Sequence, residues 1–470
     1  MVSGQIPVDV VGARTATAPA TWGQRTTWDD VQFFLPEPQW WFVIKRSVAV
    51  PDGLGLDGVL EAVRELASRH EALRTHLAQR PDGLVQWVQD GSRLSVELIE
   101  DDSPDDDGAP APLQRHIDTT MSQPVDHERE LPLRVAVGTR AGRPVTVVLA
   151  VSHVVADVRS ANLLAAELAA LLAAGAAGEP PPAHRAAWQP VDVAAAEGCE
   201  AGTRLAAKAL DRFRRQLREL PQSVLGEPPP SGPVSGRPHA QGATLRSRAA
   251  PPALRVLADR YRTSSSTVLL AVTSALLRTM AGTRLYATGL ICNNRSERML
   301  RHAVGNLSQT VLATVPVADG PFEALVAAAA DAALSAYRHG RFDPSAHRAA
   351  VGLVEAERGA ALDLDYRFND MWSAQPEARG QGSLAEPSLI RAAAADSTVV
   401  RFDGNDRDRV AFFVETFGSA DELVVTVLAD ARRFPAERLP DFLRGLDAAL
   451  VGLTERPMTV AQVGGCATGS

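Results

Sequence analysis

Residues 151–160 read VSHVVADVRS, and this stretch decides how the surrounding fold is interpreted. The run before it, residues 144–151, is apolar and rich in β-branched side chains, which predicts a buried strand. Ser160 is a residue type that caps helices, and residues 160–174 are expected to form a helix behind it. His153 and Asp157, four residues apart, therefore lie in a loop between a buried strand and a helix.

Two interpretations of this loop are open from the residues alone. Apolar neighbours would keep the His153 imidazole neutral and able to accept a proton, as a general base requires. Alternatively, His153 is a core histidine with a satisfied hydrogen bond, and Asp157 caps the following helix. The spacing of His and Asp is short and common, so it does not choose between the two.

The rest of the chain mixes helical and strand patterns. Helices are expected at residues 58–68, 113–122, 266–280, 321–336 and 435–450. Strands are expected at residues 84–88, 94–99, 131–137, 285–291, 311–317, 410–416 and 422–428. Because these elements do not alternate as regular β-α-β units, the pattern predicts an α+β fold rather than a doubly wound sheet.

Two segments rich in Pro and Gly, at residues 178–182 and 226–242, divide the chain into halves. A charged amphipathic helix is expected between them at residues 204–220. We therefore expect an N-terminal lobe at residues 1–180, a linker with a bridging helix at 181–242, and a C-terminal lobe at 243–470.

Composition narrows the class of protein. Of the 470 residues 45% are hydrophobic, and 48 Lys and Arg face 56 Asp and Glu, for a net charge of −8. This excess of acid disfavours a nucleic acid or an anionic membrane as the main partner. The three cysteines (Cys199, Cys292, Cys466) are far apart and form no C-x-x-C, so neither a disulfide framework nor a zinc knuckle is expected.

Targeting signals and common cofactor motifs are not expected either. The N-terminus lacks the apolar core of a secretory signal, and the apolar stretch at residues 161–177 looks too short to cross a bilayer. No G-x-G-x-x-G follows an expected strand, no phosphate-binding G-x-x-x-x-G-K-[ST] or G-x-S-x-G occurs, and the ten histidines show no tight metal spacing. We expect a cytoplasmic protein with no bound cofactor and no metal.

The loop at residues 152–158 resembles the H-H-x-x-x-D-G motif of nonribosomal peptide synthetase condensation domains, which share a fold with chloramphenicol acetyltransferase. Residues 69–75 (RHEALRT) match the family's R-H-E-x-L-R-T motif. Weaker matches in the same order are TWGQRTTW at 21–28, NNR at 293–295, VGNLSQT at 304–310 and FP at 434–435. By this resemblance the chain is a divergent condensation domain, either freestanding or cut from a longer synthetase.

The resemblance implies two acetyltransferase-like lobes in a V-shaped pseudo-dimer, with the active site at their junction and His153 facing a tunnel. The implied enzyme is an acyltransferase that joins an acyl or aminoacyl thioester to an amine, giving an amide, or less readily to a hydroxyl, giving an ester. The donor would be the phosphopantetheine arm of an acyl or peptidyl carrier protein, with a CoA thioester as the weaker alternative. The acceptor would be a small-molecule amine or a carrier-bound group, and a monomer is expected.

Individual roles follow from the same resemblance. His153 would take the proton from the attacking group or hold that group in line, and the start of the following helix could stabilise the oxyanion. Asp157 would be structural and held by an arginine, with Arg295 as the first candidate and Arg74 and Arg69 behind it, because a buried Asp without a partner is costly. Residues assigned to the tunnel or substrate are Ser152, Asn369, Gln309 and Trp372.

Three positions depart from the family pattern. Ser152 replaces the first His, Val158 replaces the Gly after the Asp, and Gln309 replaces the Asn of the V-N-T segment. A β-branched residue does not readily take a positive φ, so the loop would differ if the family loop needs one. These changes keep open an inactive platform that recruits a carrier protein or a tailoring enzyme, although the retained His153 favours an enzyme.

Overall fold

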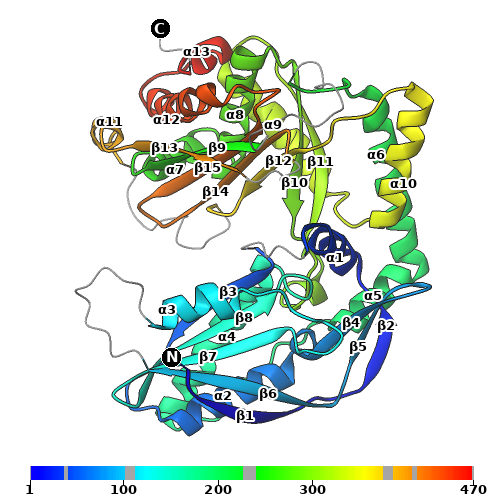
Figure 1. Cartoon of the computed structure of the whole chain (residues 1–470). Helices are drawn as coiled ribbons and strands as arrows, with labels where there is room; N and C mark the ends of the chain where they lie inside the picture. The colour runs from blue at the N-terminus through cyan, green and yellow to red at the C-terminus, as the bar shows by residue number, and fades with distance from the viewer. Residues whose placement is uncertain are drawn as a thin grey trace. The chain divides into compact units, whose positions relative to one another are not determined.

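The computed structural model describes residues 2–35, 41–100, 112–225, 240–373, 385–404 and 410–467. The chain divides into two compact units (Figure 1). The first unit comprises Met1–Ala207 and Asn293–Gln309, and the second comprises Lys208–Cys292 and Thr310–Ser470. Each unit combines helices with its own sheet, so the expected α+β class is confirmed.

A five-stranded sheet of order β1-β6-β7-β8-β3 forms the centre of the first unit. Its strands are β1 (Val2–Val11), β3 (Val43–Ala49), β6 (Gly91–Glu100), β7 (Leu133–Arg140) and β8 (Arg143–Ser152). β8 pairs antiparallel with both β7 and β3, and all its residues from 147 to 152 are buried. A strand that is covered on both faces has a continuous run of apolar residues, and for this reason the buried strand expected at residues 144–151 is confirmed as β8.

Helices α2 (Leu56–Arg69) and α4 (Val158–Ala177) pack against each other and against this sheet. A second sheet of order β2-β5-β4 is formed by β2 (Ala16–Pro19), β5 (Gly83–Val88) and β4 (Thr75–Arg80). The other elements of the unit are α1 (Trp22–Phe34), η1 (Glu71–Arg74), α3 (Pro112–His116), the π-helix η2 (Ile117–Met121), α5 (Pro190–Gly198) and η3 (Arg298–Leu300).

The second unit is built on a seven-stranded sheet of order β11-β10-β12-β14-β15-β9-β13. Its strands are β9 (Ala240–Ser247), β10 (Leu285–Cys292), β11 (Gln309–Pro316), β12 (Tyr366–Asp370), β13 (Thr398–Asp403), β14 (Phe412–Gly418) and β15 (Leu423–Asp430). Its helices are α7 (Ala250–Arg260), α8 (Ser265–Ala281), α9 (Phe322–Tyr337), α10 (Pro344–Arg358), α11 (Pro387–Ala394), η5 (Ala436–Arg438), α12 (Leu439–Glu455) and α13 (Val460–Gly465).

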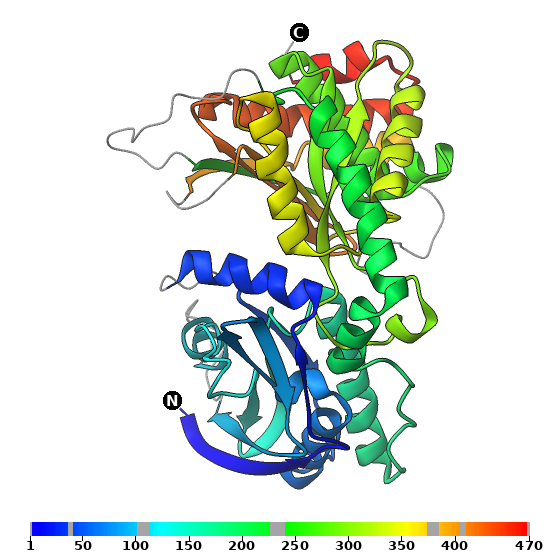
Figure 2. The same ribbon diagram turned by 90° about the vertical axis from the view of Figure 1, so that its right-hand side faces the viewer.

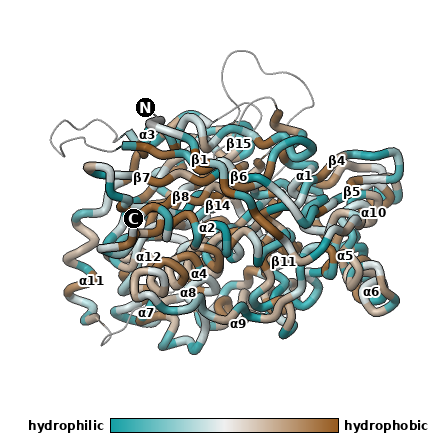
Figure 3. The backbone as a smooth tube through the Cα atoms, turned by 90° about the horizontal axis from the view of Figure 1, so that it is seen from below, coloured by the Kyte–Doolittle hydropathy of each residue, from teal (hydrophilic) through white to brown (hydrophobic). Residues whose placement is uncertain are grey.

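Helix α8 supplies much of the core of the second unit, and its apolar colouring in Figure 3 matches its nearly complete burial. Helix α6 (Glu200–Glu219) contains the boundary between the two units. Its C-terminal part lies beside α10, where Arg218 pairs with Glu357 at 2.9 Å (Figure 2). The expected amphipathic helix is therefore present, whereas residues 226–239 of the expected linker lie outside the described residues.

The segment at residues 293–309 is the main difference from the expected division of the chain. From the sequence it was expected in the C-terminal lobe, at 243–470, whereas it belongs to the first unit. Arg295 is hydrogen-bonded to Asp157 in the loop that follows β8, and Gly305 to Ser160 in the first turn of α4, which ties this segment to the first unit. A contact between residues so far apart in the chain leaves no trace in local periodicity.

Local expectations also need correction. Strands β1 and β3 were not expected, and the helix expected at residues 113–122 changes after α3 into the π-helix η2. Residues 53–58 read GLGLDG, which is a G-x-G-x-x-G, and they come after the unexpected strand β3. The expectation that no such motif follows a strand was therefore wrong. Among the described strands, β3 pairs only with β8, and the two run antiparallel. The described strands therefore do not form the parallel β-α-β unit that a dinucleotide-binding site needs at this motif.

Helix α4 is longer than expected. It has 20 residues and is long and apolar enough to cross a membrane, so the length argument against a span was wrong. In this unit its buried leucines, Leu164, Leu168, Leu171 and Leu172, recur every three or four residues and form a single stripe. That stripe faces the core beside α2 and β3, which accounts for its apolar composition.

Candidate active site

Asp157 fixes the junction between β8 and α4. Its backbone is extended, with φ −91° and ψ 175°, and its Oδ1 accepts the N–H of Ser160 at 2.8 Å, so Asp157 is the N-cap of α4. The expectation that Ser160 caps this helix was wrong by three residues. The Ser160 hydroxyl instead donates to the Gly305 carbonyl at 2.7 Å and accepts the Gly305 N–H at 3.0 Å.

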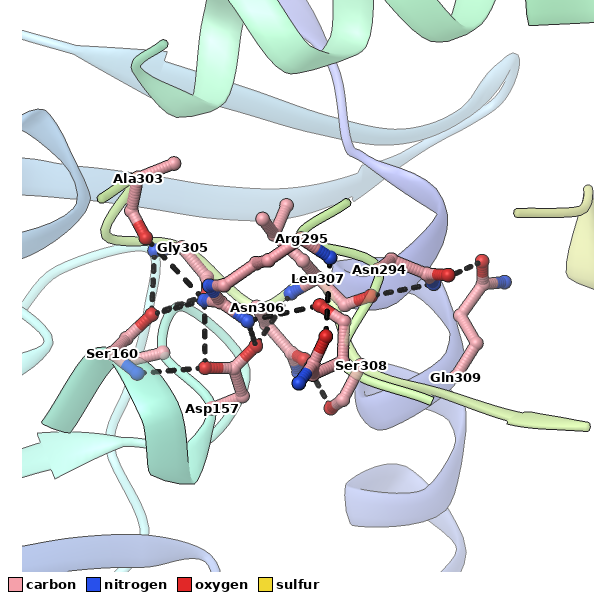
Figure 4. A network of polar contacts seen from close by, with 12 residues as sticks. Asp157, Ser160, Asn294, Arg295, Ala303, Gly305, Asn306, Leu307, Ser308 and Gln309 are labelled. Carbon is pink, nitrogen blue, oxygen red and sulfur yellow. Dashed lines mark hydrogen bonds and ion pairs between the residues drawn. The ribbon is translucent and has the colours of Figure 1, made fainter. Parts of the chain in front are cut away.

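Arg295 is the partner of Asp157 (Figure 4). Its two terminal nitrogens reach the two carboxylate oxygens at 2.7 and 2.8 Å, and both side chains are almost fully buried. Burial alone would raise the pKa of Asp157, but the Arg295 charge and the N–H groups of Ser160 and Leu307 outweigh it and lower the pKa. Asp157 is therefore an ionised structural group rather than a second base.

The same guanidinium also binds the backbone around it. It donates to the carbonyls of Asn293 and Gly305 at 3.0 and 3.2 Å and to the Ser160 hydroxyl at 2.7 Å. Each terminal nitrogen of Arg295 therefore has more than one partner, in a planar two-pronged arrangement that a lysine ammonium does not offer. The pair thus fastens residues 293–309 to the start of α4.

Arg74, the second candidate, does not reach this site. Its side chain donates to the carbonyl of Ala67 at 3.1 Å and to that of Gln89, and it fills the space beside Gly12, where a Cβ would meet the guanidinium. Its role beside Asp157 was therefore assigned wrongly, because it joins the end of α2 to the end of β5. Arg69, the third candidate, pairs with Glu65 and Glu167 instead.

His153 is held by its backbone and by one ring nitrogen. Its N–H donates to the Phe42 carbonyl at 2.8 Å, and its carbonyl accepts from the Asn306 amide at 2.7 Å. Its Nδ1 lies 3.0 Å from the Ala156 carbonyl. Since a carbonyl only accepts, Nδ1 carries the proton and Nε2 of the neutral ring keeps its lone pair.

No hydrogen-bond partner of Nε2 is found among the residues that the structure describes. The His153 ring is half-buried, and the Trp41 ring lies edge-on to it with 6.1 Å between the two ring centroids. The capping Asp157 and the satisfied ring nitrogen agree with the second interpretation of the sequence, and the role of His153 as a general base stays a prediction that rests on its other nitrogen.

Comparison with known proteins decides the family. A model of the condensation domain matches residues 18–398. The chain belongs to the condensation domain family. Curated relatives include the nonribosomal peptide synthetase kk1B of Curvularia clavata, 26% identical over 314 residues, and the isonitrile lipopeptide synthase of Mycobacterium tuberculosis, 27% identical over 351 residues. These matches cover 64% and 70% of this chain but only 2% and 13% of the relatives, so the chain spans a small part of either protein.

Solved structures show the same fold. A condensation domain that mediates chain release from the enacyloxin polyketide synthase aligns with a TM-score of 0.70 at 18% identity, and the alignment covers 95% of this chain and 83% of that one. The starter condensation domain of rhizomide synthetase, solved with C8-CoA, aligns with 0.68 at 16% identity, covering 95% and 97%. The X-domain of teicoplanin biosynthesis in complex with OxyB aligns with 0.65 at 17% identity, covering 98% and 99%.

The two departures in the loop of this condensation domain have separate explanations. Val158 is the first residue of α4, and it is not among the described residues with positive φ, so this loop needs no Gly there. Ser152 is buried, and its hydroxyl lies 2.6 Å from Nε2 of His127 and accepts the Val154 N–H at 3.3 Å. Burial lowers the pKa of His127 to about 4, so this imidazole is neutral at pH 7.

Ser152 is therefore a support of the loop rather than a substrate-lining residue, which corrects its expected role. Sequence reasoning missed His127 because it lies 25 residues before Ser152 and outside any motif. Gln309, the third departure, is also buried, and its side-chain oxygen lies 3.5 Å from the Asn294 amide.

The remaining expected site residues of the condensation domain belong to the second unit. The Trp372 side chain is fully buried and donates its indole N–H to the Ser419 carbonyl at 2.6 Å, so it is a core residue and not a tunnel wall. Asn369 on β12 donates to Glu415 on the neighbouring strand β14 at 3.1 Å. Burial raises the pKa of Glu415 to about 7. Glu415 was not singled out from the sequence.

Proposed function

We propose that this condensation domain is an acyltransferase that moves an acyl or aminoacyl group from a carrier-protein thioester to an amine, forming an amide. Transfer to a hydroxyl, forming an ester, is the second choice. The single observation that carries the proposal is the state of His153, whose Nδ1–H is held by the Ala156 carbonyl while Nε2 has no partner among the described residues. A general base needs one fixed tautomer and one free lone pair.

The chemistry follows from that tautomer. The amine nitrogen attacks the thioester carbonyl carbon, a C–N bond forms, and the carbonyl oxygen carries the negative charge of the tetrahedral intermediate. Nε2 of His153 takes the proton that the nitrogen loses. When the C–S bond breaks, the imidazolium returns the proton to the departing thiolate, so the free phosphopantetheine thiol and the amide are the products.

Proton removal is best placed together with bond formation. A free α-ammonium titrates at about pH 8 and a free imidazole at about pH 6.5, so complete proton transfer from such an ammonium to an imidazole before attack is uphill. A base that acts during attack accelerates such reactions by roughly 10² to 10⁴. The start of α4 contributes less than expected, because the Asp157 side chain already accepts the Ser160 N–H at the helix N-terminus.

The donor and partners are part of the proposal. Condensation domains act on carrier-bound or CoA thioesters, and we assign this chain a phosphopantetheinyl donor on an acyl or peptidyl carrier protein. The acceptor is a small-molecule amine or a group on a second carrier. A CoA thioester is the alternative donor, supported by the fold shared with a domain solved with C8-CoA.

One observation favours a second function. The first His of the family motif is Ser152 here, and its hydroxyl is engaged with His127. A recruiting platform would tolerate this change, and one neighbour of the same fold was solved in complex with OxyB. In that case the chain would bind a carrier or a tailoring enzyme and form no bond.

Intact-protein mass spectrometry separates the two functions. The chain is incubated with an octanoyl-loaded carrier protein or octanoyl-CoA and a panel of free amino acids and hydroxy acids. Loss of the acyl mass from the carrier, with formation of the amide or ester, is expected for the wild type and not for His153→Ala. Equal product from His153→Ala would contradict the proposed catalysis, and carrier binding without any transfer would favour the platform.

A further inference from the structure

Three metal-ligating side chains meet in the first unit, away from the His153 loop. His70 is the C-cap residue of α2, Glu167 lies on α4, and His184 follows α4 in the stretch before α5. The His70 Nε2 lies 2.8 Å from one oxygen of Glu167, and the His184 Nδ1 lies 3.5 Å from the other. One ligand atom from each residue lies within 4.8 Å of the others.

We propose that His70, Glu167 and His184 bind one divalent transition metal ion, with Zn²⁺ as the best match. Two imidazoles and one carboxylate are a common zinc ligand set, and the fourth position of a tetrahedral ion would be taken by water. No metal site was expected from the sequence, because the three residues lie on separate segments and His70 is 97 positions from Glu167. The structure brings them together.

The geometry needs only a small adjustment. Ligand atoms at about 2.0–2.1 Å from a tetrahedral ion lie about 3.3 Å apart, so the widest separation, which is at most 4.8 Å, must contract by up to about 1.5 Å. His184 can supply that movement, because it is exposed and lies outside helices and strands. His70 is buried and already in place, and it binds through Nε2 once its proton lies on Nδ1.

The surroundings of Glu167 are compatible with an ion. Arg69 donates to the Glu167 oxygen that faces His184, at 2.8 Å, and it also pairs with Glu65 at 2.7 Å. Carboxylate ligands of metals are usually held by such an outer hydrogen bond. Because Glu65 balances the charge of Arg69, the group of Glu65, Arg69 and Glu167 keeps a net negative charge that favours a cation.

A bound ion would fasten the stretch between α4 and α5. At present this stretch is held to α2 by the Arg69 guanidinium, which donates to the Pro182 carbonyl at 2.8 Å. The ion would add direct bonds from His184 to both helices. It plays no part in the proposed transfer reaction, and its test does not depend on that reaction.

Cobalt(II) is the probe for this site. The 470-residue chain is freed of metal with a chelator and titrated with Co²⁺, whose visible absorption reports tetrahedral nitrogen and oxygen ligands. The bound metal is counted by mass spectrometry. We expect one ion per chain. His184→Ala should weaken binding at least about tenfold, since a lost ligand costs no less than a lost outer partner. Because His184 is exposed and lies outside helices and strands, His184→Ala should leave the fold intact, which thermal unfolding of the metal-free protein checks.

Two further variants make the result decisive. His184→Cys replaces one ligand by another, and it should restore binding with an added thiolate-to-cobalt absorption band. His116→Ala removes another histidine of this unit that pairs with a carboxylate, Glu97 at 2.5 Å, and should leave Co²⁺ binding unchanged. The proposal is overturned if the wild type binds no Co²⁺, or if His184→Ala binds it as tightly as the wild type.

Discussion

Replacing Arg295 with alanine should destabilise the first unit strongly. The change leaves the Asp157 carboxylate buried, with only the N–H groups of Ser160 and Leu307 as partners. Removing one member of a buried ion pair typically costs about 3–5 kcal/mol, which is a large share of the roughly 5–15 kcal/mol that holds a typical domain folded. We expect Arg295→Ala to lower the free energy of unfolding of this unit by about that amount in urea denaturation.

The dependence on pH identifies the cause. In the wild type the pKa of Asp157 is lowered, so its contribution to stability is present above the unfolded pKa of about 3.9 and is lost as pH falls through the lower folded value. Without Arg295, uncompensated burial raises the folded pKa of Asp157 above the unfolded one. The penalty of Arg295→Ala should then shrink as pH falls through that raised pKa.

A double-mutant cycle supplies the control. Asp157→Asn keeps an oxygen that can cap α4 through the Ser160 N–H, and Arg295→Met keeps much of the side-chain volume. The two changes together should cost less than the sum of the single changes, with a coupling of about 1–3 kcal/mol. Additive costs, or a penalty for Arg295→Ala that does not change with pH, would refute the assignment of this pair as the fastening of residues 293–309.

Three further substitutions in the first unit have predictable effects on its free energy of unfolding. Burial holds the pKa of His127 at about 4 in the folded protein, below the value of about 6.5 in the unfolded chain. The contribution of His127 to the free energy of unfolding is therefore complete above about pH 6.5. It is lost as the pH falls toward 4, by up to about 3 kcal/mol. His127→Gln should therefore flatten the dependence of the unfolding free energy on pH in that range, and an unchanged slope would show that His127 is protonated in the folded state. Gly23→Ala would place a Cβ 2.2 Å from the Asn306 carbonyl oxygen and should cost about 1–3 kcal/mol in denaturant. Gly198→Ala, whose Cβ would meet nothing within 4 Å, should be close to neutral, and equal effects of the two changes would argue against a tight contact at Gly23.

Local sequence predicted the elements that carry the site better than the contacts between them. The buried strand before Ser152 could be predicted because burial on both faces leaves a continuous apolar run in the sequence. The helix after it was also predicted, but its start was misplaced, because Asp157 and not Ser160 caps it. Arg295 could be named only through the family resemblance together with the cost of an unpaired buried carboxylate. Its place was then fixed by contacts across 138 residues.

The residues that sequence reasoning misplaced are those whose role depends on distant packing. Arg74 carries the right charge but binds backbone carbonyls at the ends of α2 and β5, and Trp372 fills a core rather than a tunnel. His127 and His184 lie in irregular segments, where no periodicity marks which side chains will meet Ser152 or Glu167. Chemistry-bearing residues can be read from a sequence, but their partners here come from the tertiary fold.

The central claim is that Nε2 of His153 accepts a proton during acyl transfer. His153→Asn tests it most directly, because the Asn amide can keep the donor to the Ala156 carbonyl while removing the nitrogen at the Nε2 position. The measurement is the single-turnover rate of transfer from a loaded carrier, in protein whose unfolding free energy matches the wild type. We expect the rate to fall by about 10² to 10⁴. A variant that is equally stable and as fast as the wild type would contradict the account.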